Sequence, residues 1–444
     1  MNTGISHITY DIPKIYLNIE DFSKERQINA EKLKKGLGIH KMAFLDQHED
    51  TATLAANALL KLFRQNNIDP KSINRIYLGT ESALDSSKPT STYAVEMVEN
   101  FLGDRVFKHT DVTDMTFACI GAVDVLQNAL DYVKSNPNDK AIVIASDFAK
   151  YDLNSPGEYT QGAGAVAMLV ESNPKLMSFD STFGVGYKSE HDFFKPRRHH
   201  PINQNSQHLT TDQILQVYRE EPVFDGKFSN QCYQGRICEA YFHFKNLKNI
   251  QSKLHEAWSG LIFHLPYAFH GKRIFSEIFR LEKDNVASED VTSNLYDFNE
   301  LKTVSKTEEY QNLVSEKIRD AQRASSHIGN MYSASIFMSL ISELWYKQSR
   351  LMSGDKLGFI AYGSGSKAKV FEGQLVKGFS KQLAHLNLDE VLKNRTPISF
   401  KTYEDLHRKM RTQSVVRPQN EFFLDKINTE TVGLVGQRHY KFAN

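Results

Sequence analysis

The stretch from Asp114 to Val133 constrains the fold of this chain more than any other feature of its sequence. From Ile120 onward almost every residue is apolar or small. The few polar residues recur at the spacing of one narrow helical face: Asp124, Gln127, Asn128 and Asp131. This pattern predicts a helix that is buried over most of its circumference. We therefore expect the rest of the chain to be organised around this helix.

Cys119 is placed by this pattern in the first turn of the predicted helix. Unpaired backbone N–H groups and the positive end of the helix dipole favour a thiolate at such a position. The alternative is a small, inert core residue, which is the usual state of a free cysteine. Ala118 and Gly121 allow close approach to Cys119, and this favours a nucleophile.

Composition and charge exclude several classes of protein. The net charge is +1, with acids and bases interspersed, which argues against a nucleic-acid or polybasic membrane partner. No apolar run approaches membrane-spanning length, and the N-terminus lacks a signal-peptide core. The three cysteines, Cys119, Cys232 and Cys238, have neither metal-type spacing nor an even disulfide framework. We therefore expect a reduced, cytoplasmic enzyme without a metal.

The 444 residues are long for one simple domain, so we expect two core units or a duplicated one. Helices are predicted from about residues 19 and 50, and over 251–263 and 329–344. Strands are predicted over 4–10, near 15–17, and over 75–79, 140–146, 160–170, 176–185, 356–362 and 368–376. The glycines at 162 and 164 are spaced wrongly for a dinucleotide-binding fingerprint, so a Rossmann fold is rejected.

The last third of the chain repeats the plan of the first. A small-residue helix, a strand, a glycine-rich turn and a second strand follow one another in both. Asn330 then occupies the place that Cys119 holds in the first half. This order predicts an internal duplication with a site at the pseudo-twofold axis.

Residues 188–250 are polar and rich in histidine and aromatic residues, which is typical of an insertion. Lys195, Arg197, Arg198 and two adjacent histidines form a local positive patch within it. This patch is either a solvated face or a site for a phosphate-bearing ligand. Residues 282–325 are charged and are expected to be helical and exposed.

Two further residues are candidates for chemistry. Glu81 lies just past a predicted strand end, where functional groups gather in open α/β sheets, although an isolated acid there is more often a cap or a surface group. His264 would lie at the exit of the predicted 251–263 helix, because a residue that precedes proline, here Leu265, avoids helical backbone angles.

Seven segments together resemble the hydroxymethylglutaryl-CoA synthase (HMG-CoA synthase) family of the thiolase superfamily. They occur in the family's order over nearly the whole chain: Gly79-Thr-Glu-Ser82, Ala118-Cys119 with its helix, Thr160-Gln-Gly-Ala-Gly-Ala165, Asp192-Phe-Phe-Lys-Pro196, Phe263-His-Leu-Pro-Tyr267, Gly329-Asn-Met-Tyr332 and Tyr362-Gly-Ser-Gly-Ser366. The resemblance implies an α/β, thiolase-like fold of two similar halves in a five-layer αβαβα arrangement. The halves would be residues 1–175, with Cys119, and 176–444, with the insertion, His264 and Asn330. It also implies a homodimer.

The resemblance implies a role for each catalytic residue. Cys119 would take an acetyl group from acetyl-CoA as a thioester. Glu81 would remove a proton from the acetyl methyl group and later protonate the new alkoxide, and burial would raise its pKa toward neutrality. His264 would polarise the carbonyl of acetoacetyl-CoA. Asn330 and the backbone near Ser364 would hold thioester oxygens, and water would release the product.

The remaining matches are expected to bind substrate or to support the site. Tyr151 and Thr160 fall on substrate-lining positions, and Lys272 falls where a cation meets the CoA phosphates. The acids that match supporting positions are Asp85, Asp147 and Asp192. No cofactor is implied besides the two acyl-CoA substrates.

Two departures from the family pattern concern the pocket. Ile120 stands where an aromatic residue is often found after the nucleophile, and Phe269 stands where a lysine often follows the site histidine. These two departures bear on the shape of the acyl pocket and on the CoA contacts, and they leave the catalytic triad intact.

The favoured function is condensation of acetyl-CoA with acetoacetyl-CoA in isoprenoid precursor (mevalonate) supply. The runner-up is a polyketide β-branching synthase that acts on a β-ketoacyl chain tethered to an acyl carrier protein. Lys272 and the basic 195–198 region mildly favour CoA. A silent scaffold protein would be expected to lack Cys119, Glu81 or His264, and all three are present.

Overall fold

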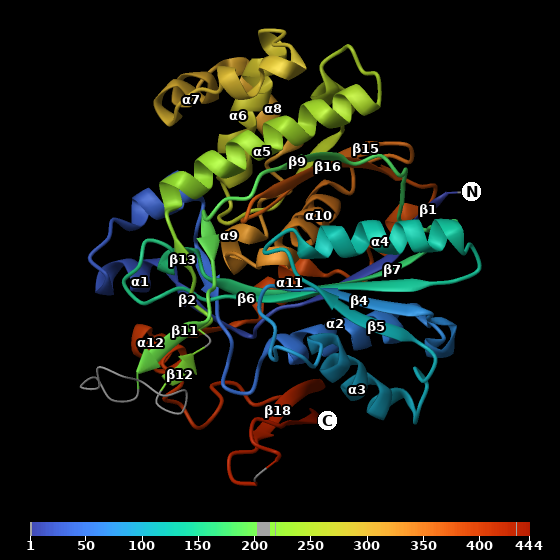
Figure 1. The fold of residues 1–444 in the computed structure, drawn as a ribbon, viewed down its shortest axis with the longest axis vertical. Coiled ribbons are helices and arrows are strands. Elements are labelled where there is room, and N and C mark those ends of the chain that lie inside the picture. Colours follow the sequence, from blue (N-terminus) through green and yellow to red (C-terminus); the bar gives the residue numbers. More distant parts are fainter. Residues whose placement is uncertain (1, 202–213, 218, 432) are drawn as a thin grey trace.

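The computed structural model describes residues 2–201, 214–217, 219–431 and 433–444 (Figure 1). Its main sheet has ten strands, in the order β14-β15-β16-β8-β1-β7-β6-β4-β5, with β9 paired to β16. One half of this sheet comes from the first part of the chain and the other half from later segments. The two halves meet where β8 pairs with both β1 and β16.

The first half of the sheet contains five strands: β1 (Thr3–Asp11), β4 (Arg75–Gly79), β5 (Asp111–Met115), β6 (Ala141–Ala149) and β7 (Gly162–Ser172). The strand β4 runs parallel to β5 and β6, whereas β7 runs antiparallel to β6 and β1. Helices α2 (Thr51–Asn66) and α3 (Thr90–Leu102) cover one face, and α4 (Gly121–Ser135) covers the other (Figure 1). Asp50 caps α2 by accepting from the Thr53 backbone N–H at 2.9 Å.

The second half contains the other five strands: β8 (Met177–Phe179), β9 (Gly184–Tyr187), β14 (Gly260–Phe263), β15 (Lys356–Gly363) and β16 (Lys367–Leu375). Helix α10 (Ser335–Lys347) packs on β14, on the side that faces α4. Helix α5 (Gly226–Leu247) packs on β9, β15 and β16 from the opposite side, together with α6 (His270–Lys283) (Figure 1).

Five layers result: α2 and α3, the first half-sheet, α4 with α10, the second half-sheet, and α5 with α6 (Figure 1). Three buried apolar clusters fill the spaces between the layers. The central cluster contains most of α4, including the fully buried Val123, Leu126 and Ala129. The predicted α/β fold with a buried central helix is thus confirmed.

Polar residues of α4 contact strand β16 of the second half-sheet. The Asp124 carboxylate pairs with Lys367 at 2.6 Å and with Lys369 at 2.7 Å, both on β16. Lys369 also donates to Gln127. The narrow stripe that marks this helix in the sequence therefore joins the two halves of the molecule.

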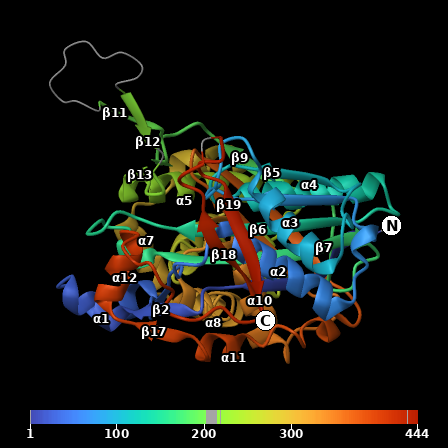
Figure 2. The same cartoon turned by 90° about the horizontal axis from the view of Figure 1, so that it is seen from below.

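Smaller elements surround these layers. A three-stranded sheet contains β2 (Ile15–Asn18), β3 (Lys41–Ala43) and β17 (Thr396–Ile398). Two-stranded pairs are β10 (Phe193–Phe194) with β13 (Val223–Phe224), β11 (Arg198–Pro201) with β12 (Ile214–Val217), and β18 (Glu421–Ile427) with β19 (Arg438–Ala443). The β18–β19 hairpin packs beside α2 and α3, while β11 and β12 extend away from the body (Figure 2). The remaining helices are α1 (Ile19–Glu25), α7 (Phe298–Ser305), α8 (Glu308–Lys317), α9 (Ser325–Ile328), α11 (Leu388–Lys393) and α12 (Phe400–His407).

The predicted helix over 251–263 is wrong. The segment forms a 3-10 turn over Leu254–Ala257 and then strand β14, which pairs in parallel with β15. The short apolar run 261–263 fits a buried strand as well as a helix, and pairing with a partner distant in sequence decided between them. His264 therefore follows a strand end rather than a helix.

The polar segment over 188–250 was expected to be an insertion outside the core, and this is wrong for its second half. Helix α5 contributes buried Tyr233, Ile237, Tyr241 and Phe244 to the outer core. The single strand expected over 176–185 is divided into β8 and β9, with a break between Phe179 and Gly184. The side chains of 198–200, part of the predicted positive patch, lie outside the described residues.

Among the described residues, no helix is long and apolar enough to cross a membrane. The division into halves at residue 175 remains a prediction.

Candidate active site

Cys119 and Glu81 form the centre of the site. Cys119 lies two residues before α4, and Glu81 is the second residue after β4. The Cys119 thiol donates to Glu81 Oε2 at 3.3 Å. The Glu81 side chain is 6% exposed and Cys119 is 8% exposed. A nucleophile and a base are thus held in contact in a nearly dry space.

Burial controls the charge of this pair. It raises the pKa of Glu81 to about 7, an effect that the Lys195 cation opposes and the Asp147 carboxylate reinforces. Burial, followed by the Glu81 carboxylate, raises the pKa of Cys119 well above its usual value. The near-neutral Glu81 agrees with the sequence-based expectation. The predicted place of Cys119 in the first turn of the helix is wrong, since the residue lies before the N-cap of α4, and the thiolate expected there is disfavoured by burial and by the neighbouring acid.

Asp147, at the end of β6, organises the surrounding backbone. Its Oδ1 accepts from the Glu81 backbone N–H and from the Thr80 hydroxyl, each at 2.9 Å. Its Oδ2 accepts from the Ser333 backbone N–H at 2.9 Å and from the Ser333 hydroxyl. Asp147 is fully buried, and its four donors hold segments of both halves together. Its role in supporting catalysis stays a prediction.

His264 leaves the end of β14 and is 2% exposed. Its backbone N–H donates to Ile360 at 3.2 Å, and its carbonyl accepts from the Tyr233 hydroxyl at 2.7 Å. Burial lowers the pKa of His264 to about 3, although a hydrogen bond with the Tyr332 backbone acts in the opposite direction. The ring is therefore neutral and can serve as a donor to a carbonyl oxygen. Its Nδ1 has no partner among the described residues.

The residue of the second half that is equivalent to Cys119 is not Asn330, as the sequence predicted. Ala118, before Cys119, has φ +40°, and Tyr332 has φ +41°. The turn that follows is closed in the same way in both halves, by Ile120 N to Phe117 O and by Ala334 N to Met331 O. Ser333, not Asn330, is therefore the counterpart of Cys119. Its hydroxyl oxygen, which donates to Asp147, also lies 2.9 Å from the Gly79 carbonyl oxygen.

Asn330 also lies in the site, on the same loop and shortly before Ser333 in sequence. It is 1% exposed; its backbone N–H donates to the Thr160 carbonyl at 2.9 Å, and its Oδ1 accepts from the Tyr332 backbone N–H. Tyr151 and Tyr332 share a small apolar cluster with Cys119. Tyr151 thus lies beside the nucleophile and Thr160 beside Asn330, and their substrate-lining roles stay predictions.

Asp192 anchors the glycine-rich turn that contains Ser364. It is fully buried, and it accepts from the Tyr362 hydroxyl at 2.7 Å and from the Gly365 backbone N–H at 2.8 Å. A Cβ on Gly363 would lie 2.8 Å from the Ile120 backbone nitrogen. The turn therefore packs directly against the chain that follows Cys119.

Two predicted residues lie away from this centre. Lys272 lies in the first turn of α6 with its Nζ 3.3 Å above the Phe269 ring, and burial lowers its pKa. Asp85 is exposed, and two backbone N–H groups, of Ser87 and Lys88, hold its pKa below the usual value. The structure thus shows Asp85 shaping a surface loop and does not bring it to Cys119.

Lys195 is a site residue that sequence reasoning placed only in a basic patch. Its Nζ lies 3.5 Å from Glu81 Oε1. Tyr332 and Ser333 were also missed, although they follow the matched Asn330. The matching segments Asp192–Pro196 and Gly329–Tyr332 were the available signal for Lys195 and Tyr332.

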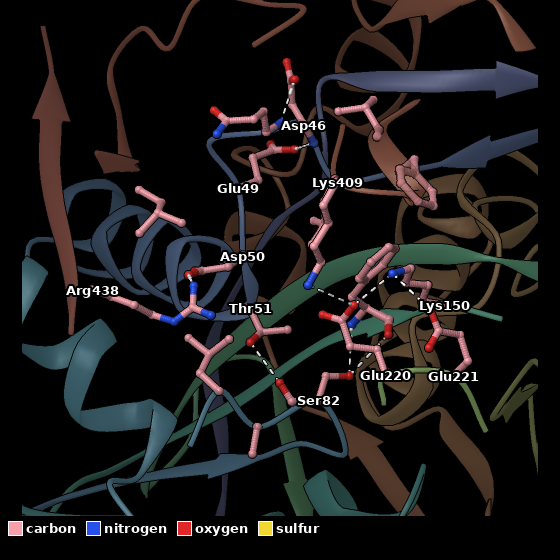
Figure 3. A pocket seen from close by; sticks show the side chains of 18 of the residues that line it. Asp46, Glu49, Asp50, Thr51, Ser82, Lys150, Glu220, Glu221, Lys409 and Arg438 are labelled. Atoms are coloured by element: carbon pink, nitrogen blue, oxygen red, sulfur yellow. Dashed lines mark hydrogen bonds and ion pairs between the residues drawn. The ribbon is translucent and has the colours of Figure 1, made fainter. Parts of the chain in front are cut away.

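A cavity of about 560 Å³ opens beside Glu81 and Lys195. Ion pairs at its wall join Arg438 to Asp50 at 3.0 Å and Lys150 to Glu220 at 3.0 Å (Figure 3). Within the described residues, no group of three or more His, Cys, Asp or Glu side chains could hold a metal ion. The site therefore contains a thiol, a carboxylic acid, a neutral imidazole and backbone donors. These groups suit acyl transfer coupled to proton transfer.

Comparisons with known proteins agree with this geometry. The model of the hydroxymethylglutaryl-coenzyme A synthase N-terminal region matches residues 1–175, and that of the C-terminal region matches residues 214–429. The hydroxymethylglutaryl-CoA synthase of Haloferax volcanii is 30% identical over all of this chain and 99% of its own length.

Solved structures show the same fold. MvaS in complex with 3-hydroxy-3-methylglutaryl coenzyme A superposes with a TM-score of 0.84 at 26% identity, covering 100% of this chain and 99% of MvaS. The HMG synthase of the curacin biosynthetic pathway, in complex with acetyl donor-ACP, has a TM-score of 0.80 at 21% identity, with both chains fully covered. At that identity the likeness concerns the fold alone.

Proposed function

The chain belongs to the hydroxymethylglutaryl-CoA synthase family, and from this premise we propose that it condenses acetyl-CoA with acetoacetyl-CoA and water to give HMG-CoA and CoA. The observation that carries the proposal is the 3.3 Å contact between the Cys119 thiol and the Glu81 carboxylate. It joins a nucleophile to an acid whose pKa is about 7, so that both protonation states of Glu81 are accessible at neutral pH.

In the first stage, Cys119 sulfur attacks the acetyl carbonyl carbon of acetyl-CoA. The bond from that carbon to the CoA sulfur breaks, the thiol proton passes to the departing CoA, and an acetyl thioester remains on Cys119. In the Gly363–Ser366 turn, which packs against Ile120, the Gly365 and Ser366 N–H groups are held by Asp192 and by the Lys188 carbonyl, so the backbone N–H of Ser364 is the donor that we assign to the developing oxyanion.

In the second stage, Glu81 removes a methyl proton from the acetyl group. The resulting carbanion attacks the ketone carbon of acetoacetyl-CoA, whose oxygen accepts a hydrogen bond from the neutral His264 ring. Protonated Glu81 then returns its proton to the new alkoxide. Water finally hydrolyses the thioester and restores the Cys119 thiol, so atoms and charges balance over the cycle.

The first turn of α6 supports CoA as the carrier. Arg273 donates to the Gly36 carbonyl at 2.8 Å, and the Phe269 backbone N–H donates to Leu37 at 3.0 Å. These contacts bring Lys272 beside the lysine-rich segment Lys32–Leu37. Lys34 and Lys35 of that segment are paired with Glu20 and Glu31, so we assign the contact with phosphate groups such as those of CoA to the adjacent cations Lys272 and Arg273. The departure at Phe269 places an aromatic ring under the Lys272 cation rather than a second charge.

The test is to mix the purified protein with acetyl-CoA and acetoacetyl-CoA and to measure free thiol and HMG-CoA. Formation of both without any carrier protein supports the proposal. Turnover only when the β-ketoacyl chain is attached to an acyl carrier protein would instead assign the protein to polyketide β-branching.

Oligomeric state, cellular compartment and pathway are also proposed. We propose a homodimer, because β5 is an edge strand that pairs only with β4 among the described residues and leaves backbone groups open to a second copy. Light scattering tests this directly. A cytoplasmic setting, a place in mevalonate supply and the lack of any cofactor besides the acyl-CoA substrates are proposed with it.

A further inference from the structure

Resting on the proposed function, we propose that Lys195 is a positioning residue that holds the Glu81 base in its ionised form and in its reactive place. Lys195 follows β10, in a segment that packs against the site from outside the two half-sheets. It lies more than a hundred residues from Glu81 in sequence.

The ion pair and the hydrogen bond of Lys195 both go to Glu81. Its Nζ lies 3.5 Å from Glu81 Oε1 and donates to the Glu81 backbone carbonyl at 3.2 Å. The same Nζ lies 4.6 Å from the centre of the Tyr332 ring. The Lys195 side chain is only 10% exposed. A lysine buried to this extent needs a compensating partner, and Glu81 provides it through both side chain and backbone.

The two oxygens of Glu81 are used differently. Oε2 accepts from the Cys119 thiol, whereas Oε1 has no hydrogen-bond partner among the described residues and faces the Lys195 charge. Lys195 therefore stabilises the negative charge without occupying the oxygen by a short hydrogen bond. An oxygen of this kind is free to accept a proton from a carbon atom.

The segment that carries Lys195 is fixed at its other end. Asp192, three residues earlier, accepts from Tyr362 and from the Gly365 backbone N–H. Between them, the Phe193 ring packs edge-on against Tyr332, with centroids 5.9 Å apart. One short segment thus ties the turn that faces the thioester oxygen to the base that acts on the same acetyl group.

The charged and titratable groups that face Glu81 come from several elements: Cys119 before α4, Asp147 on β6, Lys195 after β10, and the hydroxyls of Tyr151 and Tyr332. Asp147 and burial raise the pKa of Glu81, and Lys195 lowers it. Loss of the Lys195 charge should therefore raise the pKa of Glu81. A neighbouring opposite charge typically shifts a carboxyl pKa by about 1–3 units.

The experiment compares three variants at Lys195 through the pH dependence of HMG-CoA formation. Lys195→Met removes the charge and the hydrogen bond, Lys195→Gln removes the charge but keeps a donor for the Glu81 carbonyl, and Lys195→Arg keeps both. We expect the acid limb of the kcat profile to move up by about one pH unit or more in the first two variants. A one-unit shift lowers the rate at pH 7 roughly fivefold and leaves the rate at pH 9 nearly unchanged. Lys195→Arg should restore the wild-type profile.

Lys150→Met is the matched control. Lys150 is a similarly buried cation, 6% exposed, at the same cavity, but it pairs with Glu220 and Glu221 rather than with Glu81. The acid limb of the kcat profile of Lys150→Met should stay at the wild-type pH. An unshifted acid limb in Lys195→Met and Lys195→Gln, with a loss that is equal at all pH values, would overturn the inference and leave Lys195 structural.

A second readout separates the inference from the proposed function. The pH dependence of iodoacetamide labelling of the Cys119 peptide reports the ionisation of the coupled Cys119–Glu81 pair without any substrate. The cation lowers the pKa of Cys119 as well, so labelling should require a higher pH in Lys195→Met and Lys195→Gln. If wild-type protein forms no HMG-CoA, the proposed function fails while this labelling shift still tests Lys195. An unchanged labelling profile contradicts the inference even when the enzyme is active.

Discussion

Replacing Asp147 by asparagine removes one charge from the site and leaves the shape of the side chain almost unchanged. In the wild type, both carboxylate oxygens accept from backbone N–H groups, of Glu81 at one oxygen and of Ser333 at the other. Asparagine offers one oxygen and one NH₂ group. Whichever way the amide turns, one of these backbone N–H groups faces a donor.

The expected loss follows from that single unsatisfied group. A buried donor without a partner costs about 1–3 kcal/mol of the free energy of unfolding. Asp147 and the Ser333 backbone are both fully buried, so water cannot replace the lost acceptor. Because Asp147 joins segments of the two halves, we expect the loss to appear in the main unfolding transition.

The same substitution has a separate effect on Glu81. The Asp147 carboxylate raises the pKa of Glu81, so its removal should lower that pKa. The acid limb of condensation, expected near pH 7 in the wild type, should then move to lower pH. This is opposite in direction to the shift expected on removal of the Lys195 charge.

Two assays test this reasoning: scanning calorimetry at one scan rate, and kcat as a function of pH. Asp152→Asn is a suitable control, because Asp152 lies near the same segment but pairs with Arg219 and not with the site. Asp147→Asn should have a lower Tm and an acid limb at lower pH, and the control should show neither. A Tm equal to that of the wild type, together with an unmoved acid limb, would refute the role assigned to Asp147.

Three further substitutions probe the site. Glu81→Ala should still acquire acetyl on Cys119, because loss of the carboxylate removes a cause of the raised thiol pKa. The rate of condensation should fall ~10²–10⁴-fold. Near wild-type turnover would contradict the role of Glu81 as base. His264→Ala should weaken the binding of acetoacetyl-CoA much more than it slows acetyl transfer to Cys119, and it should cost ~2.7–4 kcal/mol in the transition state. Unchanged dependence of the rate on acetoacetyl-CoA concentration, together with a lower Tm, would make His264 structural. Gly363→Ala places a Cβ 2.7 Å from the Ile120 side chain, so it should destabilise the fold by about 1–3 kcal/mol, and a Tm no lower than that of the wild type would contradict the close packing of this turn.

Local patterns were sufficient to predict most of the core elements. The strand β4 occupies the predicted residues 75–79, and α4 begins one residue after the predicted start at Ile120. The repeated order of helix, strand, turn and strand is present as α4-β6-β7 and α10-β15-β16. These segments have strong apolar periodicity or β-branched runs, which are properties of the local sequence alone.

Elements that depend on distant partners were harder to predict. The run 260–263 became a strand because β15, about a hundred residues later, lies beside it. Helix α5 carries a weak apolar pattern because polar residues such as Gln234 are buried beside Glu277, to which Gln234 donates at 3.1 Å. A buried polar pair of this kind makes a core helix resemble a surface segment in sequence.

The sequence pointed to part of the site and to the raised pKa of Glu81, but not to the state of the Cys119 thiol or to Lys195. Cys119, Glu81 and His264 could be named because their matching segments recur in order. The protonated Cys119 thiol and the Lys195–Glu81 pair depend on burial and on a contact between segments that are far apart in the chain. Neither is encoded in local spacing.

The most direct test of the account is the mass of the Cys119 peptide after brief incubation with acetyl-CoA alone. Covalent catalysis by Cys119 predicts an added acetyl group on the peptide that contains Cys119, and none in Cys119→Ser. Acetyl on the peptides of Cys232 or Cys238, or no acetyl on any cysteine of an enzyme that still forms HMG-CoA, would contradict covalent catalysis by Cys119.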